Sequence, residues 1–164
     1  MLAPAPREAM NVAIANIREF AVAQLPREYF REFSPGRKLG QIVRPLEAVG
    51  CYIPSGRYPL VSTLLMTATL AQAAGVRHIA VASPKPTPEI LAAAHILKLT
   101  DVYRAGGAQA IAALAYGTET VQRVNRIVGP GNIYVAAAKK LLAGEVGIDF
   151  IAGPTEILIL SGDG

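Results

Sequence analysis

Four short segments of the sequence combine glycine, proline and small polar residues, a composition that suits the binding of an anionic or nucleotide ligand. They are residues 54–59 (PSGRYP), 83–88 (SPKPTP), 105–109 (AGGAQ) and 129–132 (GPGN). Glycine lets a ligand approach the backbone closely, and proline keeps a loop in shape without an ordering cost on binding. One such segment occurs in almost any α/β domain. Four of them, each after a predicted strand, indicate a shared binding edge.

The known phosphate-binding fingerprints are absent from the sequence. There is no G-x-G-x-x-G, to which residues 106–110 (GGAQA) are only a distant cousin, and no G-x-x-x-x-G-K-S/T. Composition and spacing alone therefore support an anionic or nucleotide ligand, held in part by backbone N–H groups at helix N-termini.

We assign no catalytic residue and no metal ligand from residue types. His78 falls at the start of a predicted strand and His95 inside a predicted helix, both away from the four loops. A general base or metal ligand belongs in the binding cleft. Cys51 is the single cysteine and adds no partner for a local metal motif.

The elements that must position these loops alternate between strands and helices from residue 46 onward. Short apolar runs predict strands at residues 48–53, 78–82, 101–104, 126–128 and 156–160, and Ala-rich or Leu-rich segments predict helices at 60–74, 88–98, 108–116 and 132–142. Gly75, Gly117 and Gly144 stand where C-caps would end three of the helices. Residues 146–150 fit a short strand or a connection. The alternation predicts an α/β fold: an open, mostly parallel Rossmann-like sheet with helices on both faces.

The first 45 residues do not show this alternation of short strands and helices. Apolar residues at three- and four-residue spacing predict a helix over residues 7–25, ended by Pro26, and a polar connection through residues 33–36 leads to a short edge strand at 40–45. We therefore divide the chain into residues 1–45, an N-terminal helix and edge strand, and residues 46–164, an incomplete Rossmann-like domain.

Composition excludes several classes of protein. No apolar run reaches the roughly 18 residues of a spanning helix, so we expect no membrane association. The net charge is +4, but the basic residues are dispersed and there is no tryptophan, so we expect no nucleic-acid partner. A single cysteine forms no intrachain disulfide, which favours a cytoplasmic setting.

The amino-acid sequences of the loops resemble those of the histidinol dehydrogenase family. The resemblance runs in order from about residue 7 to the end, and its motifs are residues 49–60 (VGCYIPSGRYPL), 106–119 (GGAQAIAALAYGTE), 129–132 (GPGN) and 148–156 (IDFIAGPTE). It implies an enzyme that uses NAD and zinc to oxidise L-histidinol through an aldehyde to L-histidine, in histidine biosynthesis.

The resemblance also implies site residues. Tyr52, Gln109 and Asn132 match family positions that contact NAD, and Thr155 matches one that contacts the substrate. On residue types alone, Tyr52 could equally be a half-buried aromatic residue and Asn132 a helix N-cap.

The family's zinc ligands, including two in a Gln-Ala-Glu-His motif, and its Glu-His acid and base are not found in these 164 residues. We therefore expect weak NAD binding, no zinc binding and no turnover unless a separate chain supplies the catalytic half. We also expect a homo-oligomer such as a homodimer. The alternatives are a non-catalytic nucleotide-binding or subunit-interaction module derived from this fold, and a related dehydrogenase that acts on another small polyol.

Overall fold

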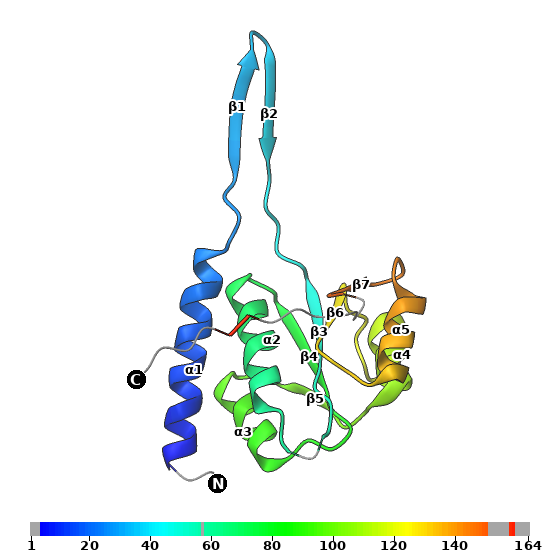
Figure 1. Cartoon of the computed structure of the whole chain (residues 1–164). Helices are drawn as coiled ribbons and strands as arrows, with labels where there is room; N and C mark the ends of the chain where they lie inside the picture. The colour runs from blue at the N-terminus through cyan, green and yellow to red at the C-terminus, as the bar shows by residue number, and fades with distance from the viewer. Residues whose placement is uncertain (1–3, 57, 151–157, 160–164) are drawn as a thin grey trace.

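The structure is a computed structural model that describes residues 4–56, 58–150 and 158–159 (Figure 1). Its elements, in chain order, are α1 (Pro4–Ala23), β1 (Tyr29–Ser34), β2 (Arg37–Gln41), β3 (Ala48–Tyr52), α2 (Val61–Ala73), β4 (His78–Ala82), α3 (Pro88–Ile96), β5 (Asp101–Tyr103), α4 (Gly107–Tyr116), β6 (Arg126–Val128), α5 (Ile133–Leu142) and β7 (Gly147–Ile148).

Five parallel strands form one sheet in the order β5-β4-β3-β6-β7. The chain builds outward from β3 through β4 to β5, and then returns to the other side of β3 to add β6 and β7. The predicted α/β fold with a parallel sheet is thus confirmed. Residues 146–150, left open on sequence, contain the short strand β7.

Alternate residues of the central strands bury into two separate cores. Val49, Cys51 and Val81 pack with α2 and α3 on one face of the sheet, whereas Ala80 and Ala82 pack with α4 and α5 on the other face. This alternation follows from the two-residue side-chain period of a strand. The helices therefore cover both faces of the sheet, as the sequence predicts (Figure 1).

Helix α1 lies outside α2 and forms an additional layer (Figure 1). Met10 is buried in the core on the α2 side of the sheet, and the Arg18 guanidinium donates to Gln72 Oε1 at 3.0 Å. One face of α1 is thus tied to the body of the molecule, while exposed apolar residues such as Phe20 remain on its other side.

The N-terminal strand prediction is wrong in its bounds and its partner. Strand β2 covers Arg37–Gln41 rather than residues 40–45, and it pairs antiparallel with β1 in a two-stranded hairpin apart from the main sheet. The predicted polar connection at residues 33–36 is the tip of this hairpin, where Pro35 and Gly36 form the turn. Gly36 has φ +78°, as the third residue of a type II turn requires. The hairpin projects from the body (Figure 1).

Two predictions made from the sequence are not tested by the described residues. In the strand predicted at residues 156–160, only 158 and 159 are described, and they lie in no helix or strand. The division of the chain at residue 45 stays a prediction. Within the described residues, no helix is both long and apolar enough to cross a membrane.

Candidate functional site at the switch point of the sheet

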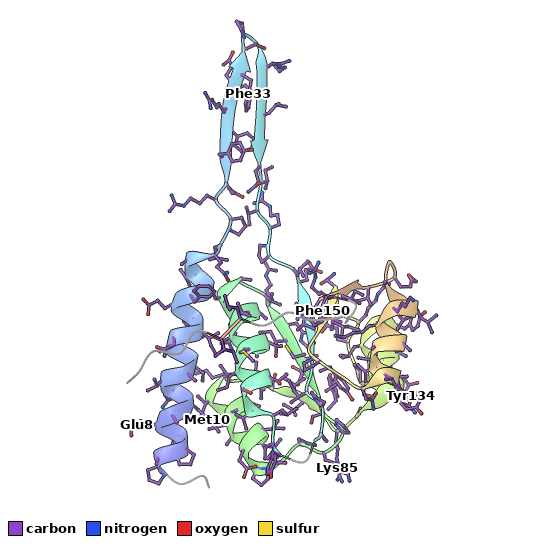
Figure 2. The ribbon with its side chains drawn as sticks, viewed as in Figure 1. Glu8, Met10, Phe33, Lys85, Tyr134 and Phe150 are labelled. Carbon is purple, nitrogen blue, oxygen red and sulfur yellow. The ribbon has the colours of Figure 1, made fainter. Side chains whose placement is uncertain are left out.

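The strand order creates a topological switch point between β3 and β6, because the connections after these two strands leave in opposite directions. In open parallel sheets, ligands bind at this point, just outside the carboxyl ends of the strands. Residues 54–59 follow β3 and residues 129–132 follow β6, so two of the four predicted loops flank the switch point. Figure 2 shows Lys85, from the loop after β4, at the end of the molecule opposite to the hairpin that carries Phe33.

Tyr52 ends β3 and connects the central strand to the start of α4. Its side chain is 3% exposed, and its hydroxyl accepts a hydrogen bond from the Gly107 N–H at 3.0 Å. Gly107 has φ +68°, a conformation that favours glycine, and it begins α4. The Tyr52 ring is thus buried in the core under α4 and α5, and its hydroxyl fixes the first turn of α4.

Gln109 lies two residues further along the same helix end and is exposed. A Cβ atom at Gly107 would lie 2.8 Å from Gln109 Oε1, so the Gln109 side chain folds back over Gly107. Tyr52 and Gln109, which are far apart in the sequence, therefore meet at one glycine. The exposed amide of Gln109 has both donor and acceptor groups to offer a ligand.

Asn132 is the N-cap of α5. Its Oδ1 accepts from the backbone N–H groups of Tyr134 and Val135, each at 3.1 Å. Asn132 is therefore the helix N-cap that the sequence left open as an alternative. Capping occupies the oxygen of its side chain. The amide nitrogen of this exposed side chain carries two N–H donors that the capping oxygen does not use.

Gly129 joins Tyr52 to the loop that carries Asn132. It has φ +111°, and a Cβ atom there would overlap the carbonyl oxygen of Tyr52. The loop after β6 thus passes directly against the end of β3, which is possible only without a side chain at this position. Gly129 also holds two polar contacts: its N–H donates to Asp149 Oδ2 at 2.8 Å, and its carbonyl oxygen accepts from Lys139 Nζ.

Lys139 and Asp149 are site residues that the sequence reasoning missed. A signal for Lys139 was available, because it falls on the α5 face that also buries Val135 and Ala138. A charged residue at a core-facing position of a helix implies a buried partner. Asp149 gives no comparable local signal, because the strand before it is only two residues long.

The loops after β3 and β4 are also linked, since the Lys85 N–H donates to Ser55 Oγ at 3.0 Å.

The contacts above place Tyr52, Gln109 and Asn132 around two shared glycines, 107 and 129. Thr155, the predicted substrate contact, lies outside the described residues.

The remaining reactive side chains lie elsewhere. His78 Nδ1 stands 3.8 Å from Asp101 Oδ2 at the amino ends of β4 and β5, and His95 is exposed on α3. Burial raises the pKa of the Cys51 thiol to about 11, so the group is neutral and a poor nucleophile near pH 7. Within the part of the chain that the structure describes, no three His, Cys, Asp or Glu side chains gather as a metal site would require.

A large apolar groove of about 920 Å³ runs beside α2 and reaches the end of β6. Its walls come from α2, from residues 43–46 before β3, and from the ends of β6 and β7. Leu46, Leu70, Val76, Val128 and Phe150 contribute to its surface. An exposed apolar surface of this kind marks a place where another segment or molecule packs.

The sheet order, the two-sided helix cover and the loops at the switch point define a doubly wound α/β protein of the Rossmann-like class. A family model described as "Histidinol dehydrogenase" matches residues 1–164. The chain belongs to the histidinol dehydrogenase family, as the resemblance on sequence implied.

Individual relatives agree with this assignment. The chain is 50% identical to the histidinol dehydrogenase of Methanothermobacter thermautotrophicus over 98% of its own length and 39% of that protein. It is 53% identical to that of Thermus thermophilus over 94% of its length and 38% of that protein. The crystal structure of histidinol dehydrogenase from Elizabethkingia anophelis matches with a TM-score of 0.88 and 38% identity, covering 94% of this chain and 37% of that chain. The chain thus spans about two fifths of the length of these relatives.

Proposed function

We propose that this chain forms the NAD-binding part of a histidinol dehydrogenase. The observation that carries the proposal is the placing of Tyr52, Gln109 and Asn132 around Gly107 and Gly129 at the switch point. This is where doubly wound sheets hold dinucleotides. The residues at this edge offer amide side chains and backbone N–H groups, which suit the ribose and phosphate oxygens of a dinucleotide.

The backbone at this edge suits close contact with a diphosphate. Added Cβ atoms at Gly106, Gly129 and Gly131 would strike neighbouring atoms, so these segments offer bare backbone with no room for side chains. Helices α4 and α5 begin beside them, and the N–H groups of their first turns that do not donate to the Tyr52 hydroxyl or to Asn132 Oδ1 are the donors proposed for the diphosphate. The Gln109 and Asn132 amides would then bond to ribose or phosphate oxygens, while Tyr52 holds the start of α4 in place.

NAD, when bound, would accept the hydride from the alcohol. The reaction proposed for the whole protein is the family's zinc-assisted oxidation of L-histidinol to L-histidine. The residues described here bind and orient, and they offer no cluster of metal ligands, so no step of the oxidation is assigned to them. We propose that the chain alone binds NAD weakly and shows no turnover, that a separate chain supplies the zinc ligands and the acid-base pair, and that the protein works in the cytoplasm.

Calorimetric titration of the chain with NAD tests the proposal. Gln109→Ala should leave the thermal midpoint unchanged, because the side chain is exposed, and should weaken NAD binding about fivefold to tenfold through the loss of one or two hydrogen bonds. Gln122→Ala, an exposed glutamine in the loop before β6, is the matched control and should bind NAD as the unaltered chain does. No heat and no thermal protection at millimolar NAD would contradict the proposal.

The apolar groove favours a second candidate function, a module whose main role is to pack against another subunit. That reading predicts self-association of the chain with no response to NAD. Sedimentation at several concentrations, with and without NAD, separates the two. A concentration-independent monomer that binds NAD would count against the module and against the homo-oligomer that we propose for the first reading.

A further inference from the structure

A buried ion pair lies directly behind the loop that carries Asn132. Lys139 Nζ, on α5, stands 2.7 Å from Asp149 Oδ1, and the two side chains are 7% and 18% exposed. Burying two charges costs free energy that their attraction only partly returns, and apolar side chains of similar volume often stabilise such a position as well or better. The presence of the pair at this place therefore points to a role other than general stability.

The pair contacts both polar groups of one residue. Asp149 Oδ2 accepts from the Gly129 N–H at 2.8 Å, while Lys139 Nζ donates to the Gly129 carbonyl oxygen. The other carboxylate oxygen, Oδ1, also accepts from the Phe150 N–H at 2.9 Å. Gly129 is thus held from both sides at the point where the chain leaves β6 with φ +111°.

The contact from Lys139 closes a short ring of chain. The backbone runs from Gly129 through the loop to the N-cap Asn132, continues along α5, and returns through the Lys139 side chain to the Gly129 carbonyl. A loop closed in this way keeps its shape without a ligand, so less ordering is required when a ligand binds. In Figure 1, α5 lies beside α4 and ends near β7, so one helix connects the loop to the strand that precedes Asp149.

We propose that Lys139 and Asp149 are positioning residues, whose ion pair fixes Gly129 and thereby sets the direction in which Asn132 is presented to the cofactor. The inference rests on the proposed function for its consequence, NAD affinity. Its structural part, the fixing of Gly129, can be measured without any ligand. Neither residue touches the cofactor in this proposal, and each acts through the backbone of the loop.

The test replaces both charges together, with Lys139→Met and Asp149→Leu in one chain, because removal of a whole buried pair is tolerated far better than removal of one partner. Lys140→Met is the matched control, since Lys140 is the exposed neighbour on the same helix. Two measurements are made on each chain: amide hydrogen exchange at Gly129 and Val135 by NMR, and NAD affinity by calorimetry. A second double variant, Lys139→Gln with Asp149→Asn, removes both charges but keeps polar side chains at both positions, and it is used if the first double variant does not fold.

We expect the folded double variant to keep the exchange rates of core amides such as Ile127, while the Gly129 amide exchanges at least about tenfold faster because its acceptor is gone. NAD binding should weaken by a similar factor, with Lys140→Met unchanged in both measurements. The second double variant, which keeps an amide oxygen as an acceptor at position 149, should show the same changes, smaller in size. A merely structural pair would lower the thermal midpoint and speed exchange throughout the core.

Three outcomes would overturn the inference in whole or in part. Gly129 exchange equal to that of Lys140→Met would show that the pair does not fix the loop. Faster Gly129 exchange with unchanged NAD affinity would show that the fixed loop does not serve the cofactor. If the unaltered chain binds no NAD, the proposed function fails, and the exchange measurement still decides whether the pair holds Gly129.

Discussion

At the scale of single residues, the candidate site depends on positions where a side chain is missing. Gly129 passes against the carbonyl oxygen of Tyr52, and the Gly107 N–H donates to the Tyr52 hydroxyl. These two glycines let β3, α4 and the loop after β6 meet at one tyrosine. The site is thus built by backbone approach, with few side-chain contacts of its own.

Gly129→Ala should be one of the most destabilising substitutions in the chain. Gly144 gives a matched comparison, because its φ of +105° is close to the +111° of Gly129 but a Cβ atom there meets nothing within 4 Å. Gly144→Ala should cost only backbone strain, about 1 to 2 kcal/mol. Gly129→Ala adds a backbone collision and should cost more than about 3 kcal/mol. Urea unfolding of both variants measures the difference, and equal costs would show that the contact with Tyr52 relaxes easily.

Cys51 should be unreactive in the folded chain. Its side chain is fully buried and its thiol is held neutral, since burial raises the pKa from 9.0 to about 11. Ellman's reagent at pH 8 should therefore react at the rate of global unfolding, and rapidly in guanidinium chloride. Fast labelling of the folded chain would contradict the buried position.

The raised thiol pKa also gives stability a direction with pH. Below pH 9 the thiol is neutral in both the folded and unfolded states, so its contribution to stability is complete. Between pH 9 and about 11 the unfolded chain loses the proton first, so stability should fall as the pH rises through this window. Cys51→Ser should show a smaller fall over the same window.

Residue types predicted the positions of the loops after the strands better than the contacts between those loops. The contact of Asn132 with NAD stays a prediction, while its oxygen caps α5 as the structural alternative held. A helix-capping preference and a ligand contact draw on the same side chain, so sequence alone leaves both open. The bonds of Lys139 and Asp149 to Gly129 depend on the return of the chain through α5 and β7, and no local pattern encodes that return.

At the scale of elements, the helices and central strands follow their sequence patterns, and the hairpin does not. Residues 29–34 (YFREFS) mix aromatic and charged side chains, and almost all of them are exposed, so no buried face imposes an alternation. The informative signal was the Pro35-Gly36 pair, which suits a two-residue type II turn between two strands. Reading these residues as a polar connection moved the predicted strand toward the body of the molecule.

The hairpin should be dispensable for the stability of the body. Strands β1 and β2 pair only with each other in the described structure, and an isolated two-stranded hairpin adds little in water. The segments before β1 and after β2 lie close together at the hairpin base, where Glu28 Oε1 accepts from the Val43 N–H at 2.9 Å. Replacing residues 29–41 by Gly-Ser-Gly should therefore leave the thermal midpoint within about 2 °C, a shift that corresponds to about 0.5 to 1 kcal/mol.

Removal of residues 1–23 is the contrasting control for the hairpin replacement. It takes away α1, whose Met10 and Ala21 are buried, and should lower the midpoint strongly. Limited trypsin digestion gives a second measurement, since Arg31, Arg37 and Lys38 are exposed on the hairpin and should be cleaved first. A large fall in the midpoint on excision of the hairpin would show that it packs against another part of the protein in solution.

At the scale of the whole molecule, the sheet is covered unevenly. Helices α2 and α3 lie over β3, β4 and β5 on one face, and no described helix covers β6 and β7 on that face (Figure 1). The strand pattern of the sequence predicts a two-sided fold, but periodicity within each element does not reveal how far a helix layer extends. The apolar groove reaches the end of β6, and it is available to bind an apolar probe or a further polypeptide.

The groove should bind an apolar dye in the folded chain, and one leucine should control much of that binding. Leu70 lines the groove and is 44% exposed, whereas Leu91 on α3 is 46% exposed and lies outside it. Leu70→Gln should reduce the fluorescence of bound anilinonaphthalene sulfonate by about half or more, because it places a polar amide in an apolar wall. Leu91→Gln should change neither the fluorescence nor the thermal midpoint. Any self-association seen by sedimentation should weaken with Leu70→Gln alone, and equal effects of the two substitutions would show that the dye and the partner surface lie elsewhere.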